Sequence, residues 1–339
     1  MEALITIWIA AIGLSIGSFL NVVIARLPND ESVVRPRSKC PKCGHQLPWY
    51  ENIPVISWLA LRGKCSGCKA PISPRYILVE LLTGTLFVAA SARFGFDWPL
   101  VSALTFFTFV IPLIFIDAEY WILPFELTLP ALAAGLLLAI PQGKEAFITA
   151  LIGAIAAFLT FRIMEFAGWA VTGREALGAG DKYLLAVIGA QVGWRSLLGV
   201  ILFSSLQGSV VGIIRMRMTG RAGPEPEPQV KPEGTAEAVA DEEPPQREPF
   251  TPEFLKPGLP FWKRLVFIPY TIFLQDIPDS PPPDETTGEI PDWEPQANNI
   301  PFGPWIGLAG IEVMLLGPWI VERLAHTPWQ LMSEIVFGR

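Results

Sequence analysis

Four cysteines form the first candidate site in the sequence. They occur as two Cys-x2-Cys pairs, Cys40 with Cys43 and Cys65 with Cys68, and the chain has no other cysteine. Two such pairs place four thiolates at the corners of a tetrahedron, the geometry that Zn²⁺ prefers. Because four thiolates leave no open position for water or substrate, the predicted zinc is structural. The alternatives are cysteines that only fill a buried space, or a redox pair.

The residues around the cysteines favour the metal interpretation. Gly44 follows the first pair and Gly67 lies inside the second, and glycine permits the tight turns that direct backbone amides toward sulfur. The gap between the pairs is one residue longer than the usual range. A reducing cytoplasm also disfavours disulfides. We interpret the neighbouring His45 as a hydrogen-bond donor beside the metal rather than a ligand, and we assign no role to His326.

Two aspartates interrupt segments that are otherwise apolar. Asp117 lies in the turn Ile116–Pro124, and Asp181 ends the sequence Gly-Ala-Gly-Asp at 178–181. The apolar residues after Asp181 are too few to cross a membrane unless the span starts near Leu177. We therefore expect Asp181 about one helical turn inside the membrane boundary. A carboxylate at this depth costs roughly a few kcal/mol or more, so it marks a functional site by default.

Two carboxylates at similar depth on one side of the membrane suit aspartyl proteolysis. Close like charges in a low-dielectric site cannot both ionise easily, so the pair holds one proton. The ionised member takes a proton from water while the neutral one hydrogen-bonds the scissile carbonyl, and joint titration leaves the two roles unassigned. An ion pair is the alternative, for example Asp181 with Lys182 or Arg174. No serine, cysteine or histidine constellation competes, because both histidines are distant in sequence.

The composition places these groups in a membrane. Of 339 residues, 51% are hydrophobic and 17% are charged, whereas soluble domains have about 25% charged residues. Mean hydropathy is +0.41. We therefore expect an all-α polytopic protein in a lipid bilayer. The net charge of −7 comes from the acidic segment 221–299, and neither a basic nucleic-acid binder nor a small disulfide-stapled domain fits.

Eight apolar segments have about the 20 residues that a helix needs to cross the hydrocarbon core. They are Ala3–Ala25, Tyr76–Ala92, Trp98–Ile116, Ile122–Ile140, Ala146–Gly168, roughly Leu177–Trp194, Ser196–Ile214 and Phe302–Val321. The first is too long for a cleaved signal peptide and lacks a basic leader. Lys and Arg concentrate in loop 26–75, and cytoplasmic loops retain such residues. We expect this loop in the cytoplasm and both termini outside.

These patterns divide the chain into five parts. We expect a first transmembrane helix at 1–25, a cytoplasmic four-cysteine zinc-knuckle loop at 26–75, a six-helix membrane peptidase core at 76–214, a Pro/Glu-rich and largely disordered cytoplasmic insertion at 215–299, and a last transmembrane helix with an outer tail at 300–339. Residues 221–299 hold 17 of the 33 prolines, which excludes a regular helix there. Within them, Leu265–Leu274 is either a membrane-surface anchor or a short helix packed on the protein.

An ordered set of motifs covers nearly the whole chain outside 221–299. It comprises Gly17–Val23, Arg26–Pro28, Ser38–Pro41, Trp49–Val55, Ser57–Leu59, Ile72–Tyr76, Val79-Glu80, Asp117 seven residues before Pro124, the Gly-x-Gly-Asp of 178–181, and Ile300–Pro304. In this order the motifs resemble those of the type 4 prepilin peptidases. The chain departs from the family at Phe125, where an Asp is common, and at Lys182, since the family's Lys commonly lies one residue later.

The resemblance implies a bifunctional enzyme of the bacterial inner membrane. Members of the family cleave the basic leader of prepilins and pseudopilins after a Gly at the cytoplasmic membrane face. Many then methylate the new N-terminal amine, usually of Phe, with S-adenosylmethionine as the donor. By motif, Asp117 and Asp181 are the catalytic pair, and Cys40, Cys43, Cys65 and Cys68 are the Zn²⁺ ligands. The implied partners are pilin-like substrates of type IV pilus or type II secretion machinery.

Two other functions remain open from the residues alone. A transporter could use the two aspartates as a proton relay, but this leaves the cysteine loop without a purpose. A catalytically silent metal-bearing scaffold for a secretion complex is the other alternative. For the methyl donor, the sequence contains no glycine-rich binding loop of the usual kind, so we assign no donor-site residues.

Overall fold

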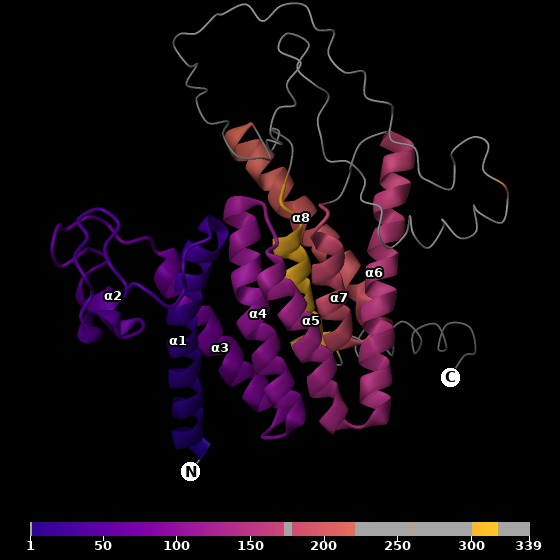
Figure 1. The fold of residues 1–339 in the computed structure, drawn as a ribbon, viewed down its shortest axis with the longest axis horizontal. Coiled ribbons are helices and arrows are strands. Elements are labelled where there is room, and N and C mark those ends of the chain that lie inside the picture. The colour runs from indigo at the N-terminus through magenta and orange to yellow at the C-terminus, as the bar shows by residue number, and fades with distance from the viewer. Residues whose placement is uncertain (1, 173–177, 221–259, 261–299, 318–339) are drawn as a thin grey trace, which may run out of the picture. The chain divides into compact units, whose positions relative to one another are not determined.

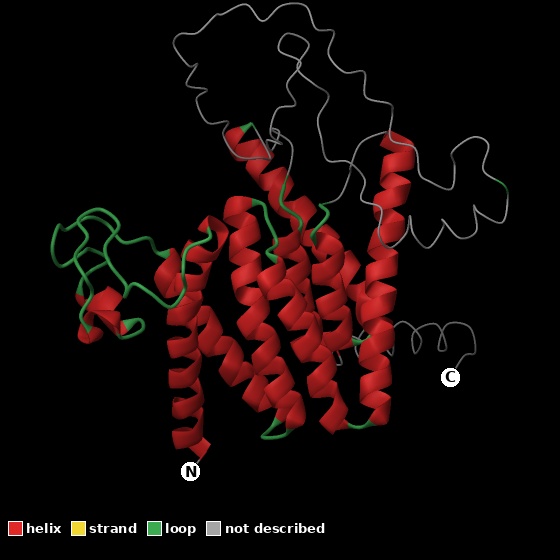
Figure 2. Ribbon diagram, in the orientation of Figure 1, coloured by secondary structure: helices red, strands yellow, loops and turns green. Residues whose placement is uncertain are grey.

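The structure is a computed structural model, and it describes residues 2–172, 178–220, 260 and 300–317. Apart from two isolated β-bridges, the regular elements in these residues are helical (Figure 2), which confirms the predicted all-α class. The chain divides into two units. The first comprises Met1–Phe158, Gly180–Ser205 and Pro301–Arg339, and the second comprises Leu159–Ala179 and Leu206–Ile300.

The helices in chain order are α1 (Glu2–Arg26), α2 (Ile56–Ala60), α3 (Arg75–Phe94), α4 (Trp98–Tyr120), α5 (Phe125–Ala139), α6 (Lys144–Thr172), α7 (Asp181–Val192) and α8 (Leu197–Thr219). A further helix covers Gly303–Gly317 and is called the last helix below. Short 3-10 turns cover Leu27–Asn29, Trp49–Asn52, Ile140–Gln142 and Trp194–Ser196.

In the first unit, α1 lies side by side with α3 (Figure 1) because glycines line their interface. A Cβ atom on Gly13 would lie 2.9 Å from the Cα of Gly84, and one on Gly17 would lie 2.7 Å from the Cα of Glu80. Small residues let helix backbones approach this closely, which compensates for the weak hydrophobic drive between helices in lipid. The cysteine loop therefore begins and ends on two tightly packed helices.

Helices α4 and α7 form the core of the same unit. Phe107 and Ile111 on α4 and Leu184 and Ile188 on α7 are buried. At one end of the two helices, Gln191 Nε2 on α7 donates a hydrogen bond of 2.8 Å to Ser102 Oγ on α4. A satisfied polar pair in an apolar interior fixes how two helices align along their axes.

The described part of the second unit consists of the C-terminal halves of α6 and α8. Within α6, Arg162 and Glu165 form a buried ion pair with a separation of 2.8 Å between Nη1 and Oε2. Their spacing of three residues places both side chains on one face of the helix. The pairing compensates part of the cost of burying two charges.

Six helical segments are long and apolar enough to cross a membrane. They are Leu4–Asn29, Arg75–Phe94, Trp98–Tyr120, Phe125–Gln142, Lys144–Gly168 and Trp194–Thr219. Among the described residues, α7 and the last helix are shorter, so the predicted count of eight spans is not confirmed. The chain is thus a multi-pass membrane protein with at least six candidate spans in its described part.

Two predicted boundaries near the aspartates are wrong. Helix α7 begins at Asp181 and not near Leu177, because residues 179 and 180 form a turn, so Asp181 is the first residue of the helix. The expected depth of Asp181 relative to the membrane boundary stays a prediction. Helix α4 continues through Tyr120, so Asp117 lies within its last turn and not in a loop. The predicted insertion beyond residue 220, except residue 260, lies outside the described residues. So do Leu265–Leu274, Arg174 and His326.

Candidate active site and metal centre

Asp117 is buried in the last turn of α4. The residue is 6% exposed to solvent. The helix ends at Tyr120, and the next residue, Trp121, adopts a left-handed conformation with φ 61° and donates its backbone N–H to the carbonyl of Asp117 at 3.0 Å. This bond satisfies a carbonyl at the helix end. The turn therefore fixes the backbone of Asp117 where the chain leaves the helical core.

Asp181 begins α7 and is 5% exposed. Gly180, immediately before it, packs against Leu123 in the segment that joins α4 to α5. A Cβ on Gly180 would lie only 2.8 Å from the Cβ of Leu123. The second glycine of the Gly-x-Gly-Asp motif is therefore needed for the close approach of the segment before α7 to the segment between α4 and α5. This approach brings α7 to the end of α4 that carries Asp117.

The two carboxyl groups face one backbone position on the last helix. A Cβ built on Gly303 would lie 2.6 Å from Asp117 Oδ2 and 3.3 Å from Asp181 Oδ1. A single point thus lies within van der Waals distance of both carboxylates. Asp117 and Asp181 therefore lie near each other in the structure, although they are distant along the chain.

The residues that follow Asp181 in α7 pack against one another and against the start of α5. Lys182 is buried, and its Nζ lies 5.6 Å from the ring centroid of Tyr183. Phe125, at the position where the family commonly has Asp, stacks edge-on against Tyr183 with ring centroids 5.1 Å apart. An aromatic pair of this geometry stabilises the contact between α5 and α7. The Asp-to-Phe departure therefore replaces a third acid with a packing contact.

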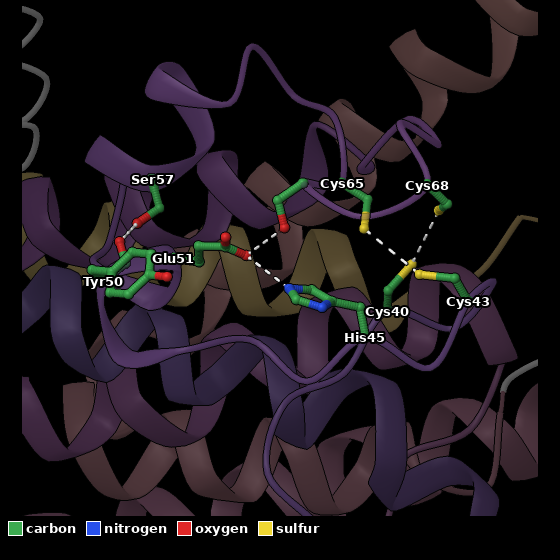
Figure 3. Close-up of polar contacts among 9 residues, drawn as sticks. Cys40, Cys43, His45, Tyr50, Glu51, Ser57, Cys65 and Cys68 are labelled. Carbon is green, nitrogen blue, oxygen red and sulfur yellow. Dashed lines mark hydrogen bonds and ion pairs between the residues drawn. The ribbon is translucent and has the colours of Figure 1, made fainter.

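The four cysteines form a compact cluster in the loop between α1 and α3. Their sulfur atoms all lie within 4.8 Å of one another, and the four could hold a metal ion. The Sγ of Cys40 lies 3.9 Å from that of Cys68, and the Sγ of Cys43 lies 3.9 Å from that of Cys65 (Figure 3). Tetrahedral Zn–S bonds of about 2.3 Å require sulfur atoms about 3.8 Å apart. The donor set therefore fits zinc.

The same turn builds each half of the cluster. In the first half, the backbone N–H of Cys40 donates to the carbonyl of His45 at 2.9 Å. In the second half, the backbone N–H of Cys65 donates to the carbonyl of Ala70 at 2.9 Å, and Lys69 has a positive φ of 59°. An isolated β-bridge closes each turn. The repeated Cys-x2-Cys sequence thus folds into a repeated local structure.

These turns change the acidity of the thiols. The backbone N–H of Cys43 lowers the pKa of Cys40 to about 6, and the backbone N–H of Cys68 lowers the pKa of Cys65. For Cys43 the backbone N–H of His45 acts in the same direction, but the neighbouring thiols raise its pKa to about 11. Thiolates are the form that binds metal, and a bound cation favours deprotonation of the remaining thiols.

His45 lies beside the cluster without belonging to it. Its Nε2 lies 3.4 Å from Glu51 Oε2. The same carboxylate oxygen accepts a hydrogen bond of 2.8 Å from Ser66 Oγ. Glu51 thus joins the two halves of the loop through a polar contact next to the sulfurs. Sequence reasoning missed Glu51, whose only signal was its place inside the Trp49–Val55 motif.

Comparisons with known proteins agree with this arrangement. The model of the bacterial peptidase A24 N-terminal domain matches residues 11–94, and the model of the type IV leader peptidase family matches residues 104–213. The chain belongs to the type IV leader peptidase family. Both aspartates fall in the second match and all four cysteines in the first. No solved structure matches the chain.

Members of this family with high identity carry one name. The prepilin leader peptidase/N-methyltransferase of Myxococcus xanthus (strain DK1622) is 55% identical over 95% of this chain and 93% of its own length. Its namesake from Aeromonas hydrophila is 44% identical over 59% of this chain and 77% of its own length. The one from Neisseria gonorrhoeae is 37% identical over 62% of this chain and 82% of its own length.

Proposed function

We propose that this family member is a membrane-embedded aspartyl protease that removes the leader of prepilins and pseudopilins, and that it then methylates the new N-terminus. The relatives' name states both activities. The observation that carries the proposal is the approach of two buried carboxylates, Asp117 and Asp181, to one backbone position. The substrates so defined are those of type IV pili or type II secretion machinery.

In the proposed reaction, Asp117 and Asp181 share one proton, because two close charges in a buried site cannot both ionise easily. The ionised carboxylate takes a proton from a water molecule, whose oxygen attacks the carbonyl carbon of the residue before the cut. The protonated carboxyl donates a hydrogen bond to the carbonyl oxygen. Collapse of the tetrahedral intermediate breaks the C–N bond, and the leaving amine takes a proton. Acid and base belong to the pair and not to named members.

We further propose that the carboxylates face the cytoplasm. Glu119, two residues after Asp117, forms an ion pair with Arg75, which is the first residue of α3 and the last of the basic loop. The catalytic end of α4 thus lies at the same end of the unit as the cysteine loop. Because basic loops remain in the cytoplasm, this favours leader cleavage at the inner face of the cytoplasmic membrane.

We propose that the four cysteines bind a structural Zn²⁺. The sulfur separations suit a tetrahedral ion, and the donor set leaves no position for a reacting water. When bound, the ion crosslinks two turns that are distant in sequence. Loop 26–75 has few buried apolar residues of its own, so we expect the ion to supply much of its folding energy.

We propose that a pocket in the N-terminal match binds the methyl donor. It has a volume of about 500 Å³, inside the range of roughly 300–1,000 Å³ for small-molecule sites. Its lining includes Arg26, Arg37, Ser38 and Asn52 beside the aromatic Phe19. The two guanidinium groups suit the donor's carboxylate, the hydroxyl and amide suit its ribose and base, and the ring suits stacking. S-adenosylmethionine supplies the activated methyl group when bound.

The experiment that tests the function is co-expression with a prepilin that carries a Gly-Phe junction. Loss of the leader on a gel and the mass of the pilin N-terminus report the two activities separately. We expect a shortened pilin with one added methyl group. An intact leader, with normal amounts of enzyme in the membrane, would contradict the proposal.

The donor pocket has its own test. Arg37→Glu is expected to raise the KM for S-adenosylmethionine at least tenfold while leader cleavage is unchanged. Arg93→Glu, at the last turn of α3 and outside the pocket, is the matched control. If both charge reversals leave methylation intact, the donor binds elsewhere.

A further inference from the structure

The last helix places a glycine against both aspartates. The ideal Cβ position of Gly303 is 2.6 Å from Oδ2 and 3.0 Å from Cγ of Asp117, and the residue is buried. Carbon atoms do not approach carboxylate atoms this closely without repulsion. Even the methyl group of alanine would therefore push Asp117 away from its position or push the last helix away from Asp117.

The backbone of the same residue contacts the carboxylate directly. The backbone N–H of Gly303 lies close enough to the Asp117 carboxylate to stabilise its negative charge. Within the described part of the chain, Oδ2 of Asp117 is buried and has no hydrogen-bond partner. One contact thus orients the carboxylate while Oδ2 stays available for a proton or a water molecule. Hydrogen bonds from the backbone cost no reorganisation during a reaction, because the donor is already in place.

Two more glycines hold the helix in this register. A Cβ on Gly307 would lie 2.5 Å from Cγ1 of Ile114 on α4, and one on Gly310 would lie 2.9 Å from Cδ1 of Ile188 on α7. The three glycines recur at the spacing of one helix face. This face therefore contacts α4 one turn before Asp117 and contacts α7 two turns after Asp181.

We infer that Gly303 is a positioning residue for leader cleavage that acts through Asp117. Its N–H is the orienting donor. Because it has no side chain, it leaves the space in which the two carboxylates come together. Gly307 and Gly310 set the depth at which the last helix presents it. The inference rests on the proposed catalytic role of the two aspartates and adds a third element to the site. A shift of about 1 Å in a reacting group can cost 10²-fold in rate.

The test is Gly303→Ala, assayed for cleavage of prepilin and, separately, for methylation of a pilin that already lacks its leader. We expect kcat for cleavage to fall ~100-fold, with KM within about twofold of wild type and with methylation unchanged. Intact methylation shows that the protein is folded. Gly317→Ala is the matched control on the same helix, since its Cβ would lie 3.4 Å from Val313, an ordinary contact. Wild-type cleavage by Gly303→Ala overturns the inference.

A second pair of variants decides the matter if Gly303→Ala also loses methylation. Gly307→Ala keeps Gly303 but forces the last helix away from Ile114. Cleavage should fall in this variant and recover when Ile114→Ala removes Cγ1, the obstructing atom. Full cleavage by Gly307→Ala, or no recovery in the double variant, contradicts the positioning role. Asp117→Ala in the same assay tests the proposed function separately from the positioning role of Gly303, because cleavage by that variant would contradict the proposed function itself.

Discussion

The carboxylate of Glu80, on α3, accepts a hydrogen bond of 2.7 Å from the backbone N–H of Val55, in the cysteine loop. Val55 has a positive φ of 62°, which is costly for a β-branched residue and persists only where surrounding contacts enforce it. Glu80 thus ties the cysteine loop to the α1–α3 pair through an unfavourable backbone conformation.

Replacing Glu80 should loosen the loop more than the catalytic core. Glu80→Ala leaves the partly buried Val55 N–H without its acceptor, at a cost of about 1–3 kcal/mol. We expect faster proteolysis within 26–75 and reduced methylation, while leader cleavage stays within about threefold of wild type. Mass spectrometry of the fragments and of the pilin terminus measures both. Glu80→Gln keeps an acceptor oxygen and should be milder; equal damage from both variants would show that charge, not the hydrogen bond, matters.

Each aspartate should be indispensable for cleavage and dispensable for methylation. Asp117→Asn and Asp181→Asn keep the shape of the side chain but remove the shared proton, so cleavage should fall by about 10⁴-fold or more. A pre-cleaved pilin should still be methylated. The matched control is Asp97→Asn, which lies at the N-terminus of α4 and accepts a hydrogen bond of 2.8 Å from the Trp98 N–H, a role that Asn can fill. Cleavage by either variant would show that the replaced aspartate takes no part in the reaction.

Loss of one cysteine should release the metal. Cys40→Ser removes one of the four donors, so the purified protein should contain less than one zinc per chain, against one in wild type. Metal content should also fall as pH is lowered, because protons compete with the metal for thiolates. Elemental analysis measures both effects. Ser66→Ala, which leaves all four sulfurs in place, is the control; zinc retained at full occupancy by Cys40→Ser would argue for a different ligand set.

The pair Ser102 and Gln191 should couple α4 to α7. Either single alanine variant leaves a buried or partly buried polar partner unpaired and should cost about 1–3 kcal/mol, whereas the double variant should cost less than the sum. Thermal unfolding in detergent measures the three stabilities. Additive effects would mean that the hydrogen bond of 2.8 Å contributes no coupling.

Local signals in the chain predicted the metal cluster well and the carboxylate pair in part. The two Cys-x2-Cys turns are short-range structures, so the sequence that encodes them also specifies their shape. The ends of α4 and α7 were predicted less accurately. Apolar composition alone does not reveal that residues 179 and 180 form a turn, or that α4 continues through Glu119 to Tyr120, because Glu119 finds its partner Arg75 only in the folded chain.

Residue types and spacing alone determined that this chain is helical, spans a membrane, could bind a metal through Cys40, Cys43, Cys65 and Cys68, and carries Asp117 and Asp181 where charge is expensive. Tertiary structure decided how the aspartates meet. The last helix brings Gly303 to a position that faces both carboxylates, and a glycine gives no sequence signal of its own for such a contact. The reason is physical: close approach depends on the absence of a side chain, and only the packed neighbours show where that absence is needed.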